Sequence, residues 1–170
     1  MSGQDVQFIE VDPASNEAAA AVSRYYAELA QRFPEGFDVD AYTSGAPVVD
    51  EPSRLVLAIR DGVPIACGTL RSLGDGVAEI KRMWVDPAVR GIGLGKRLLS
   101  QLESLAGQDG YRAVRLDTNG SLVEAIALYD RSGYERISRY NDNPYAQLWF
   151  EKTLVGAGSR TQRGSGRPER

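Results

Sequence analysis

Residues 83–103 read MWVDPAVRGIGLGKRLLSQLE, and this stretch decides the fold. It begins at the end of an extended run that starts at Val77. Asp86-Pro87 closes that run, because the residue before a proline is biased away from helical conformation. Leucines then recur at helical spacing, namely Leu94, Leu98, Leu102 and Leu105. They predict an amphipathic helix that ends at Gly107, a natural C-terminal cap.

The segments after this helix continue the pattern. Tyr111–Thr118 is extended again. The strands before and after the helix therefore form a β-α-β unit, and they should run parallel in one sheet. Ser121 and Glu124 fit a capping box, which predicts a second helix from there to Gly133. Two closing strands are expected at Tyr134–Tyr140 and Tyr145–Lys152.

The segments before the stretch predict a helix and an antiparallel meander. The first elements are a strand and an alanine-rich helix, at Val6–Val11 and Ser15–Arg32. Asp61-Gly62 separates the strands Arg54–Arg60 and Pro64–Leu73, and an Asp-Gly pair supplies the positive φ angles of a tight hairpin turn. A second turn at residues 74–76 leads to the strand that ends at Val85. Together the segments predict an α+β fold with a mixed sheet of about seven strands and flanking helices.

Length and charge predict one acidic domain with a basic tail. A chain of 170 residues with 42% hydrophobic residues is long enough for one good core. We expect the domain at residues 1–153 and a flexible basic tail, rich in Gly, Ser and Arg, at residues 154–170. The net charge of −3 includes +3 from the tail, so the domain carries −6. An acidic domain disfavours nucleic acid and favours cationic partners such as protonated amines.

The residue types that are missing exclude several kinds of site. The sequence has no histidine, the commonest general base and metal ligand. Its single cysteine, Cys67, allows neither an intrachain disulfide nor a cysteine cluster, so we expect no metal. No run of 18 apolar residues occurs, and the first residues do not resemble a secretion signal. The sequence therefore predicts no membrane partner and a cytoplasmic location.

The densest glycine cluster of the domain joins the predicted strand to the predicted helix. It is Arg90-Gly91-Ile92-Gly93-Leu94-Gly95-Lys96-Arg97. Alternating glycines let main-chain N–H groups converge, and a helix N-terminus adds partial positive charge, so the loop suits phosphate. Arg90, Lys96 and Arg97 add positive charge; a tight turn without a ligand is the alternative. The spacing fits neither a dinucleotide fingerprint nor a P-loop, which has Ser or Thr at the position of Arg97.

Arg90–Gly95 matches the Arg/Gln-x-x-Gly-x-Gly/Ala signature of the GNAT acetyltransferase superfamily. The stretch 83–103, and AIALYDRSGY at residues 125–134, resemble the two flanking blocks of that family. The resemblance implies the GNAT acyl-CoA N-acyltransferase fold, in which the strand before the loop splays from its parallel neighbour. It also implies that the loop binds the pyrophosphate of acetyl-CoA and that the pantetheine arm lies in the resulting cleft. The residues that it assigns to acetyl-CoA are Met83, Trp84, Val85, Arg90, Gly91, Ile92, Gly93, Leu94, Gly95, Lys96, Arg97 and Asn119.

Three residues are assigned chemistry by the resemblance. The Met83 N–H would polarise the thioester oxygen, which requires a bulge that frees this donor from the strand ladder. Tyr129 lies where many family members have a tyrosine beside the coenzyme sulfur, and its hydroxyl would protonate the leaving thiolate. A packing role is the alternative. Glu79 is the candidate base, acting through water across about 13 Å of strand; an ion pair with Lys81 or another cation is the alternative. Leu122 departs from the family, many of whose members have Asn there.

These features predict an N-acetyltransferase that moves an acetyl group from acetyl-CoA to a primary amine of a small molecule or protein. It would work without a metal, as a monomer or homodimer. A non-catalytic acyl-CoA-binding regulatory protein is the alternative, and the presence of Tyr129 argues against it. A nucleotide-binding module is disfavoured by the spacing of the glycines. The fold does not identify the acceptor, although the charge of the domain favours a cationic amine.

Overall fold

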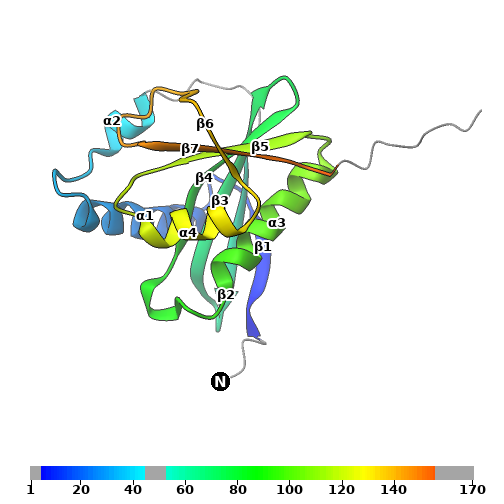
Figure 1. Ribbon diagram of the computed structural model, residues 1–170. Helices are drawn as coiled ribbons and strands as arrows, with labels where there is room; N and C mark the ends of the chain where they lie inside the picture. The colour runs from blue at the N-terminus through cyan, green and yellow to red at the C-terminus, as the bar shows by residue number, and fades with distance from the viewer. Residues whose placement is uncertain (1–4, 45–52, 156–170) are drawn as a thin grey trace, which may run out of the picture.

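The computed structural model describes residues 5–44 and 53–155, which form a mixed sheet with helices on both faces (Figure 1). The strands are β1 (Gln7–Val11), β2 (Arg54–Arg60), β3 (Val63–Gly74), β4 (Val77–Val85), β5 (Ala113–Thr118), β6 (Glu135–Ile137) and β7 (Leu148–Thr153). The helices are α1 (Asn16–Arg32), α2 (Val39–Ser44), α3 (Leu94–Gln108) and α4 (Val123–Arg131), with a short 3-10 helix at Pro87–Val89.

The sheet has seven strands in the order β1-β2-β3-β4-β5-β7-β6. Each neighbouring pair is antiparallel except β4 and β5, which are parallel and are connected through α3. The predicted α+β fold with a seven-stranded mixed sheet is therefore confirmed.

The parallel strands β4 and β5 separate after a short contact. They pair at Val77 with Ala113, at Ala78 with Val114 and at Glu79 with Arg115, and no further pair follows although both strands continue. Beyond Glu79 the two strands no longer pair with each other. The main-chain groups along their facing edges are therefore available to a ligand that lies between the strands. This is the splayed pair that the family resemblance implies.

The core lies on both faces of the sheet. On one face, leucines of α3 and the ring of Tyr129 from α4 pack on β2 to β5 and β7. On the other face, Ala18 and Ala21 of α1 pack on Leu57 and Trp84. Leu98 and Leu102 of α3 are completely buried, and burying a leucine side chain contributes about 1.5–3 kcal/mol. Helix α3 is thereby fixed firmly to the sheet, and its N-terminus lies at the carboxyl end of β4.

Two predicted helix boundaries are corrected. Helix α3 continues through Gly107 to Gln108, because the left-handed residue that ends it is Gly110, with φ of 86°. The Tyr111 N–H then bonds the Ala106 carbonyl at 3.0 Å, as in a Schellman motif. The predicted capping box of α4 does not form: Leu122 is the N-cap residue and no side chain caps it.

Other local predictions are confirmed, either in full or over a shorter range of residues. Asp61 and Gly62 have φ angles of 52° and 76°, as the predicted hairpin turn requires. Helix α4 stops just before Gly133, whose φ of 86° confirms the expected cap. The strand predicted at Tyr134–Tyr140 is correct only over β6, because the chain then leaves the sheet. Helix α2 was not predicted.

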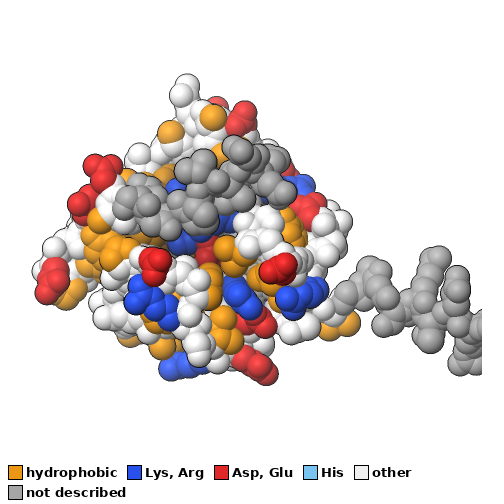
Figure 2. Space-filling model, turned by 90° about the horizontal axis from the view of Figure 1, so that it is seen from above, with side chains coloured by type: hydrophobic (Ala, Val, Ile, Leu, Met, Phe, Trp, Pro, Cys, Tyr) orange, Lys and Arg blue, Asp and Glu red, His pale blue; other side chains and the backbone are white. Residues whose placement is uncertain are grey.

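Little of the predicted basic tail lies within the described residues, which end at Val155. None of the described helices is long and apolar enough to cross a membrane. Figure 2 shows acidic and basic side chains interspersed with hydrophobic ones on the face seen from above.

Candidate active site

The loop before α3 has the conformation that its glycines predict. Gly91 and Gly93 have φ angles of 90° and 77°, a region that L-residues with a side chain rarely adopt. Gly93 is the N-cap residue of α3 and provides no side-chain cap, so main-chain N–H groups of the first turn are left for a ligand. The helix dipole adds positive potential at the same place. This end of α3 can therefore bind an anion such as phosphate.

A cleft of about 400 Å³ begins at this loop and extends between β4 and helices α1 and α4. Most of the residues predicted to bind acetyl-CoA line it: Met83, Trp84, Val85, Arg90, Gly91, Gly93, Leu94, Gly95 and Lys96. Ile92, Arg97 and Asn119 do not line it. Tyr129 also lines it. Further lining residues that the sequence did not indicate come from α1 and from α4 with its N-cap, among them Tyr25, Glu28, Leu122 and Leu128.

The charged residues of the loop have different surroundings. Arg90 forms an ion pair with Glu28 of α1, and its Nε donates to the Val85 carbonyl at 3.2 Å. The Arg97 guanidinium lies over the ring of Phe8, 5.2 Å from its centroid. Lys96 is exposed at the cleft. The positive charge available to a ligand in the cleft therefore comes chiefly from Lys96, from Arg131 of α4 and from the helix N-terminus.

Gly95 differs from Gly91 and Gly93 because it does not have a positive φ angle. A Cβ atom at this position would lie 3.4 Å from Leu128 and 3.8 Å from Val85. These are ordinary van der Waals distances, so the third glycine lies where α3 meets α4 and β4 at the edge of the cleft.

Strand β4 bulges where the cleft meets the sheet. Trp84 pairs with Cys67 and Lys81 pairs with Thr69, so Arg82 and Met83 together lie opposite one residue of β3. Arg82 has a φ of 52°, the left-handed conformation, which interrupts the regular ladder. The bulge that a free Met83 N–H requires is thus present.

A second, smaller cavity of about 50 Å³ adjoins the cleft. It opens where β4 and β5 separate, and it is closed on other sides by α1, α2 and the segment before β7. Six residues line both spaces: Tyr25, Leu29, Met83, Leu122, Ala125 and Tyr129. A ligand in the cleft and a ligand in this cavity would therefore meet at Met83 and Tyr129.

Tyr129 is buried, with 5% of its surface exposed. Its ring packs against Tyr134 and Phe150, at centroid distances of 5.8 Å and 5.6 Å. Within the described part of the chain its hydroxyl has no hydrogen-bond partner. Burial raises the pKa of this tyrosine above its ordinary value, with a smaller contribution from the Asp117 carboxylate. The hydroxyl therefore keeps its proton near neutral pH and can donate it to a group in the cleft.

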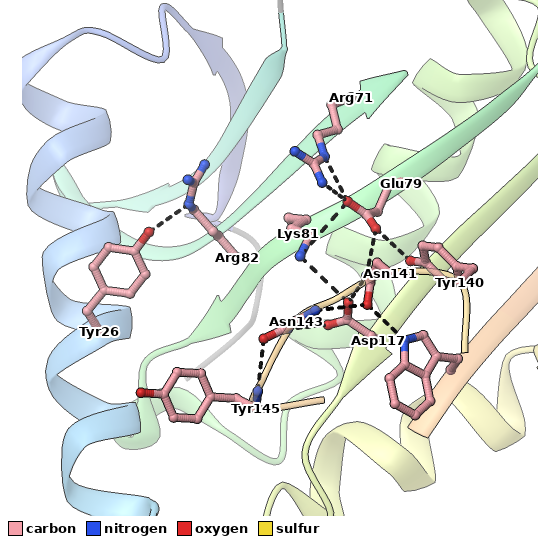
Figure 3. Close-up of polar contacts among 11 residues, drawn as sticks. Tyr26, Arg71, Glu79, Lys81, Arg82, Asp117, Tyr140, Asn141, Asn143 and Tyr145 are labelled. Carbon is pink, nitrogen blue, oxygen red and sulfur yellow. Dashed lines mark hydrogen bonds and ion pairs between the residues drawn. The ribbon is translucent and has the colours of Figure 1, made fainter. Parts of the chain in front are cut away.

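Glu79 is completely buried and lines neither the cleft nor the cavity. Its Oε1 bonds Nε and Nη2 of Arg71 at 2.7 Å and 2.6 Å, and lies 4.0 Å from Lys81 Nζ (Figure 3). Its Oε2 accepts hydrogen bonds from the Tyr140 hydroxyl at 2.6 Å and from the Asn141 amide at 3.3 Å. The sequence left open whether Glu79 forms an ion pair, and the structure shows one, with Arg71 as the closest cation.

Asp117 of β5 is the carboxylate that lines the smaller cavity. Asn141 and Asn143 both donate to it, the latter at 3.0 Å, and Lys81 Nζ lies 3.6 Å away. Asn141 Nδ2 donates to Glu79 as well, at 3.3 Å, and so connects Asp117 to Glu79, while its Oδ1 accepts from the Trp149 indole at 2.9 Å. The contacts between Asp117 and the two asparagines hold the segment between β6 and β7 over this face of the sheet (Figure 3).

Asn119 lies on the wall of the smaller cavity. Its Nδ2 donates to the Tyr145 carbonyl at 2.8 Å, and its Oδ1 accepts from the Ser121 N–H at 2.9 Å. These bonds hold the turn that leads into α4, so both groups of the amide are used within the chain.

Asp117 and the asparagines that hold it are not among the residues predicted from the sequence. The signal was present in NDNPY at residues 141–145, where short polar side chains gather before a strand. Nothing in the sequence indicated that this segment folds back onto β4 and β5, because the contacts join residues far apart in the chain.

The fold and the cleft together define the class of protein to which the chain belongs. A seven-stranded mixed sheet with a splayed parallel pair, and a glycine loop at the helix that follows, is the architecture of the acyl-CoA N-acyltransferases. The model of the acetyltransferase (GNAT) family matches residues 8–134, and the chain belongs to this family.

Individual relatives agree with this assignment. The chain is 34% identical over 105 residues to a protein named IAA acetyltransferase from Azospirillum brasilense, a match that covers 59% of this chain and 68% of that protein. The structure of a GNAT-family acetyltransferase from Staphylococcus aureus has a TM-score of 0.73 at 16% identity, and covers 88% of this chain and 99% of that one. A GNAT acetyltransferase from Elizabethkingia anophelis with acetyl-CoA bound has a TM-score of 0.63 at 16% identity, and covers 89% and 99%. These structural likenesses establish the fold.

Proposed function

We propose that the chain is an N-acetyltransferase that moves the acetyl group of acetyl-CoA to an amine. Acetyl-CoA would occupy the cleft and the amine would enter the smaller cavity. The observation that carries the proposal is that Met83 and Tyr129 line both spaces. A hydrogen-bond donor of the main chain and a protonated hydroxyl thus lie at the junction where acetyl donor and acceptor would meet.

The residues of the cleft suit acetyl-CoA. The first turn of α3, with Gly91 and Gly93 in left-handed conformations before it, provides N–H groups for the pyrophosphate, and Lys96 adds a cation. The edge of β4 from Met83 to Val85 is free of β5 and can bind the amide groups of the pantetheine arm. The Elizabethkingia relative, which has acetyl-CoA bound, supports this choice of ligand.

Two groups of this chain would favour the reaction. Acetyl-CoA supplies an activated acetyl group as its thioester. The Met83 N–H, released by the bulge, would donate to the oxygen on which negative charge develops, and such a preorganised donor contributes about 2.7–4 kcal/mol in other enzymes. The Tyr129 hydroxyl would give its proton to the departing sulfur. Burial of Tyr129 keeps that proton in place beforehand.

Removal of the amine proton is assigned to the carboxylates between β4 and β5. Asp117 lines the smaller cavity, whereas Glu79 reaches it only through Lys81 and Asn141. We therefore propose that Asp117 accepts the proton, directly or through water, and that Glu79 acts by positioning Lys81 and Asn141 around it.

An acceptor screen tests the proposal. The purified chain is incubated with acetyl-CoA and a panel of amines that includes amino acids, polyamines and peptides, and free coenzyme A thiol is measured. The proposal expects release that depends on both substrates, together with an acetylated product of the correct mass. Binding of acetyl-CoA without release from any amine would favour the non-catalytic regulatory protein instead.

A further inference from the structure

Arg82 is a cation at the smaller cavity that has no carboxylate partner among residues 5–44 and 53–155. It lines the cavity and is partly buried. Its Nε donates to the Tyr26 hydroxyl of α1 at 2.9 Å, which orients the guanidinium but does not neutralise its charge. A partly desolvated charge without a counter-ion is unfavourable, so the binding of an anion at this place gains free energy.

The other charges that line the cavity are compensated within the chain. Lys81 lies within 4.0 Å of both Glu79 and Asp117, and Asp117 is held in addition by two asparagine amides. Figure 3 shows the side chain of Arg82 directed away from this cluster, toward Tyr26. Arg82 is therefore the lining charge of the described residues that is left for a ligand.

The bulge that frees Met83 also sets the position of Arg82. The left-handed φ of Arg82 is unusual for a residue with a long side chain. The Cys67 thiol donates to the Arg82 carbonyl at 3.3 Å and supports this backbone from β3. One irregularity of β4 thus provides both the proposed donor for the thioester oxygen and a cation beside it.

We propose that the acceptor is an amine that also carries a carboxylate, and that Arg82 binds this carboxylate. A guanidinium presents two parallel N–H groups to a carboxylate, the geometry of the strongest ion pairs. Arg82 and Met83 are neighbours in β4 and both line this cavity, so a small molecule held there by Arg82 would lie in the space that the proposed thioester donor borders. The inference rests on the proposed function, because it names the substrate class of the same cavity.

A carboxylate on the acceptor differs from the simple cationic amine that the net charge of the domain predicts. An acidic domain favours a cationic acceptor, but the cavity is lined by Arg82 of β4, which has no carboxylate partner in the described part of the chain, and by the Asp117 carboxylate of β5. Such a pair suits a zwitterion, with the carboxylate at Arg82 and the amine toward Asp117.

The remaining wall of the cavity is aromatic. Phe37 lies 4.8 Å from Tyr145 and 5.3 Å from Tyr42 between ring centroids, and Phe33 stacks on Tyr145 at 5.6 Å. These rings favour an apolar or aromatic side chain on the acceptor. Phenylalanine is therefore a suitable first probe.

The test compares three acceptors that share one ring and one amine: phenylalanine, phenylalaninamide and phenethylamine. Values of kcat/KM are measured for the wild type, Arg82→Gln, Arg82→Lys and the control Arg136→Gln. Arg136 is exposed on β6, pairs with Asp130 at 3.2 Å and does not line the cavity. Each acceptor is compared with itself across variants, so differences in amine basicity cancel.

A charge-assisted hydrogen bond contributes about 1.5–3 kcal/mol, so Arg82→Gln should lower kcat/KM for phenylalanine about 10- to 100-fold. The values for the amide and the simple amine should change less than about threefold, within the usual scatter of surface substitutions. Arg82→Lys should retain part of the preference, and Arg136→Gln all of it. Equal losses for all three acceptors in Arg82→Gln, or a wild type that prefers phenethylamine, would overturn the inference.

A binding measurement separates this inference from the proposed function. 3-Phenylpropionate and its amide lack the amine and cannot react, so their affinity for the coenzyme A-loaded protein reports the carboxylate site alone. The acid should bind at least tenfold more tightly than the amide in the wild type and equally in Arg82→Gln. If neither binds while acetyl-CoA still does, the inference is wrong. If the acid binds more tightly than the amide but no amine causes release of coenzyme A, the proposed acetyl transfer is wrong and the proposed carboxylate site is supported.

Discussion

The role proposed for Tyr129 predicts that activity and stability respond separately to loss of one oxygen atom. In Tyr129→Phe the ring remains against Tyr134 and Phe150, and only the hydroxyl is removed. That hydroxyl has no partner among the described residues, so no hydrogen bond is broken. Tyr134 is the matched control, because it is equally buried but its hydroxyl donates to Glu103 at 3.1 Å.

The two variants should therefore show opposite effects. Tyr129→Phe should change the free energy of unfolding by less than about 0.5 kcal/mol, since a buried hydroxyl without a partner contributes little. Loss of a general acid should lower kcat about 10- to 1,000-fold and leave acetyl-CoA affinity nearly unchanged. Tyr134→Phe should lower the free energy of unfolding by about 0.5–1.5 kcal/mol and leave kcat unchanged.

The assay combines urea unfolding of both variants with release of coenzyme A from the best acceptor of the screen. Because burial raises the pKa of Tyr129 above its ordinary value of about 10, the hydroxyl stays protonated through the usual assay range. Its titration should therefore cause no loss of activity below that pH. Equal kcat in Tyr129→Phe and the wild type would refute the proposed role and leave Tyr129 a packing residue.

Three further predictions follow from the buried groups. Burial raises the pKa of the Cys67 thiol to about 12, so native protein should not react with a thiol reagent at pH 8; rapid labelling without unfolding would contradict this burial. Burial, aided at Tyr140 by Glu79, also raises the pKa values of Tyr42 and Tyr140. Their contribution to stability is present below pH about 10 and is lost as the pH rises further, so the urea midpoint should fall there. Comparison with Tyr42→Phe and Tyr140→Phe should show that the tyrosinate absorbance of these two residues appears only with unfolding. Asp117→Asn should lower kcat/KM most at low pH, whereas Glu79→Gln should cost about 3 kcal/mol of stability and give a pH profile parallel to the wild type; the reverse pattern would make Glu79 the base.

Much of the fold follows from local signals in the sequence. The hairpin at Asp61-Gly62 and the cap at Gly133 depend on positive φ angles, which few residues adopt easily. Helix α3 is fixed by the spacing of its leucines. Its end was misplaced because Gly107 and Gly110 are both plausible caps, and only the bond from Tyr111 to Ala106 selects the second.

The candidate site likewise has one part that the local sequence predicts and another part that depends on tertiary contacts. The phosphate loop is contiguous in sequence, and its glycines identify it. The cluster of Arg71, Glu79, Asp117 and Asn141 is assembled from three strands and a loop, so its contacts depend on tertiary structure. That Arg82 has no carboxylate partner among the described residues is likewise visible only once the neighbours of β4 are known.

The assignment of the cleft to acetyl-CoA is tested most directly by measuring the affinity of acetyl-CoA for the wild type, Gly93→Val and Gly110→Val. Both glycines have left-handed φ angles and open space around a Cβ, so the two variants bear a similar backbone penalty of about 1–2 kcal/mol at opposite ends of α3. Acetyl-CoA at 100 times its dissociation constant should stabilise the wild type and Gly110→Val by about 2.7 kcal/mol, seen as a rise in Tm of several degrees. Gly93→Val should lose this rise, because its side chain and altered backbone disrupt the phosphate site. An undiminished rise in Gly93→Val, or none in the wild type, would contradict the assignment of the cleft to acetyl-CoA.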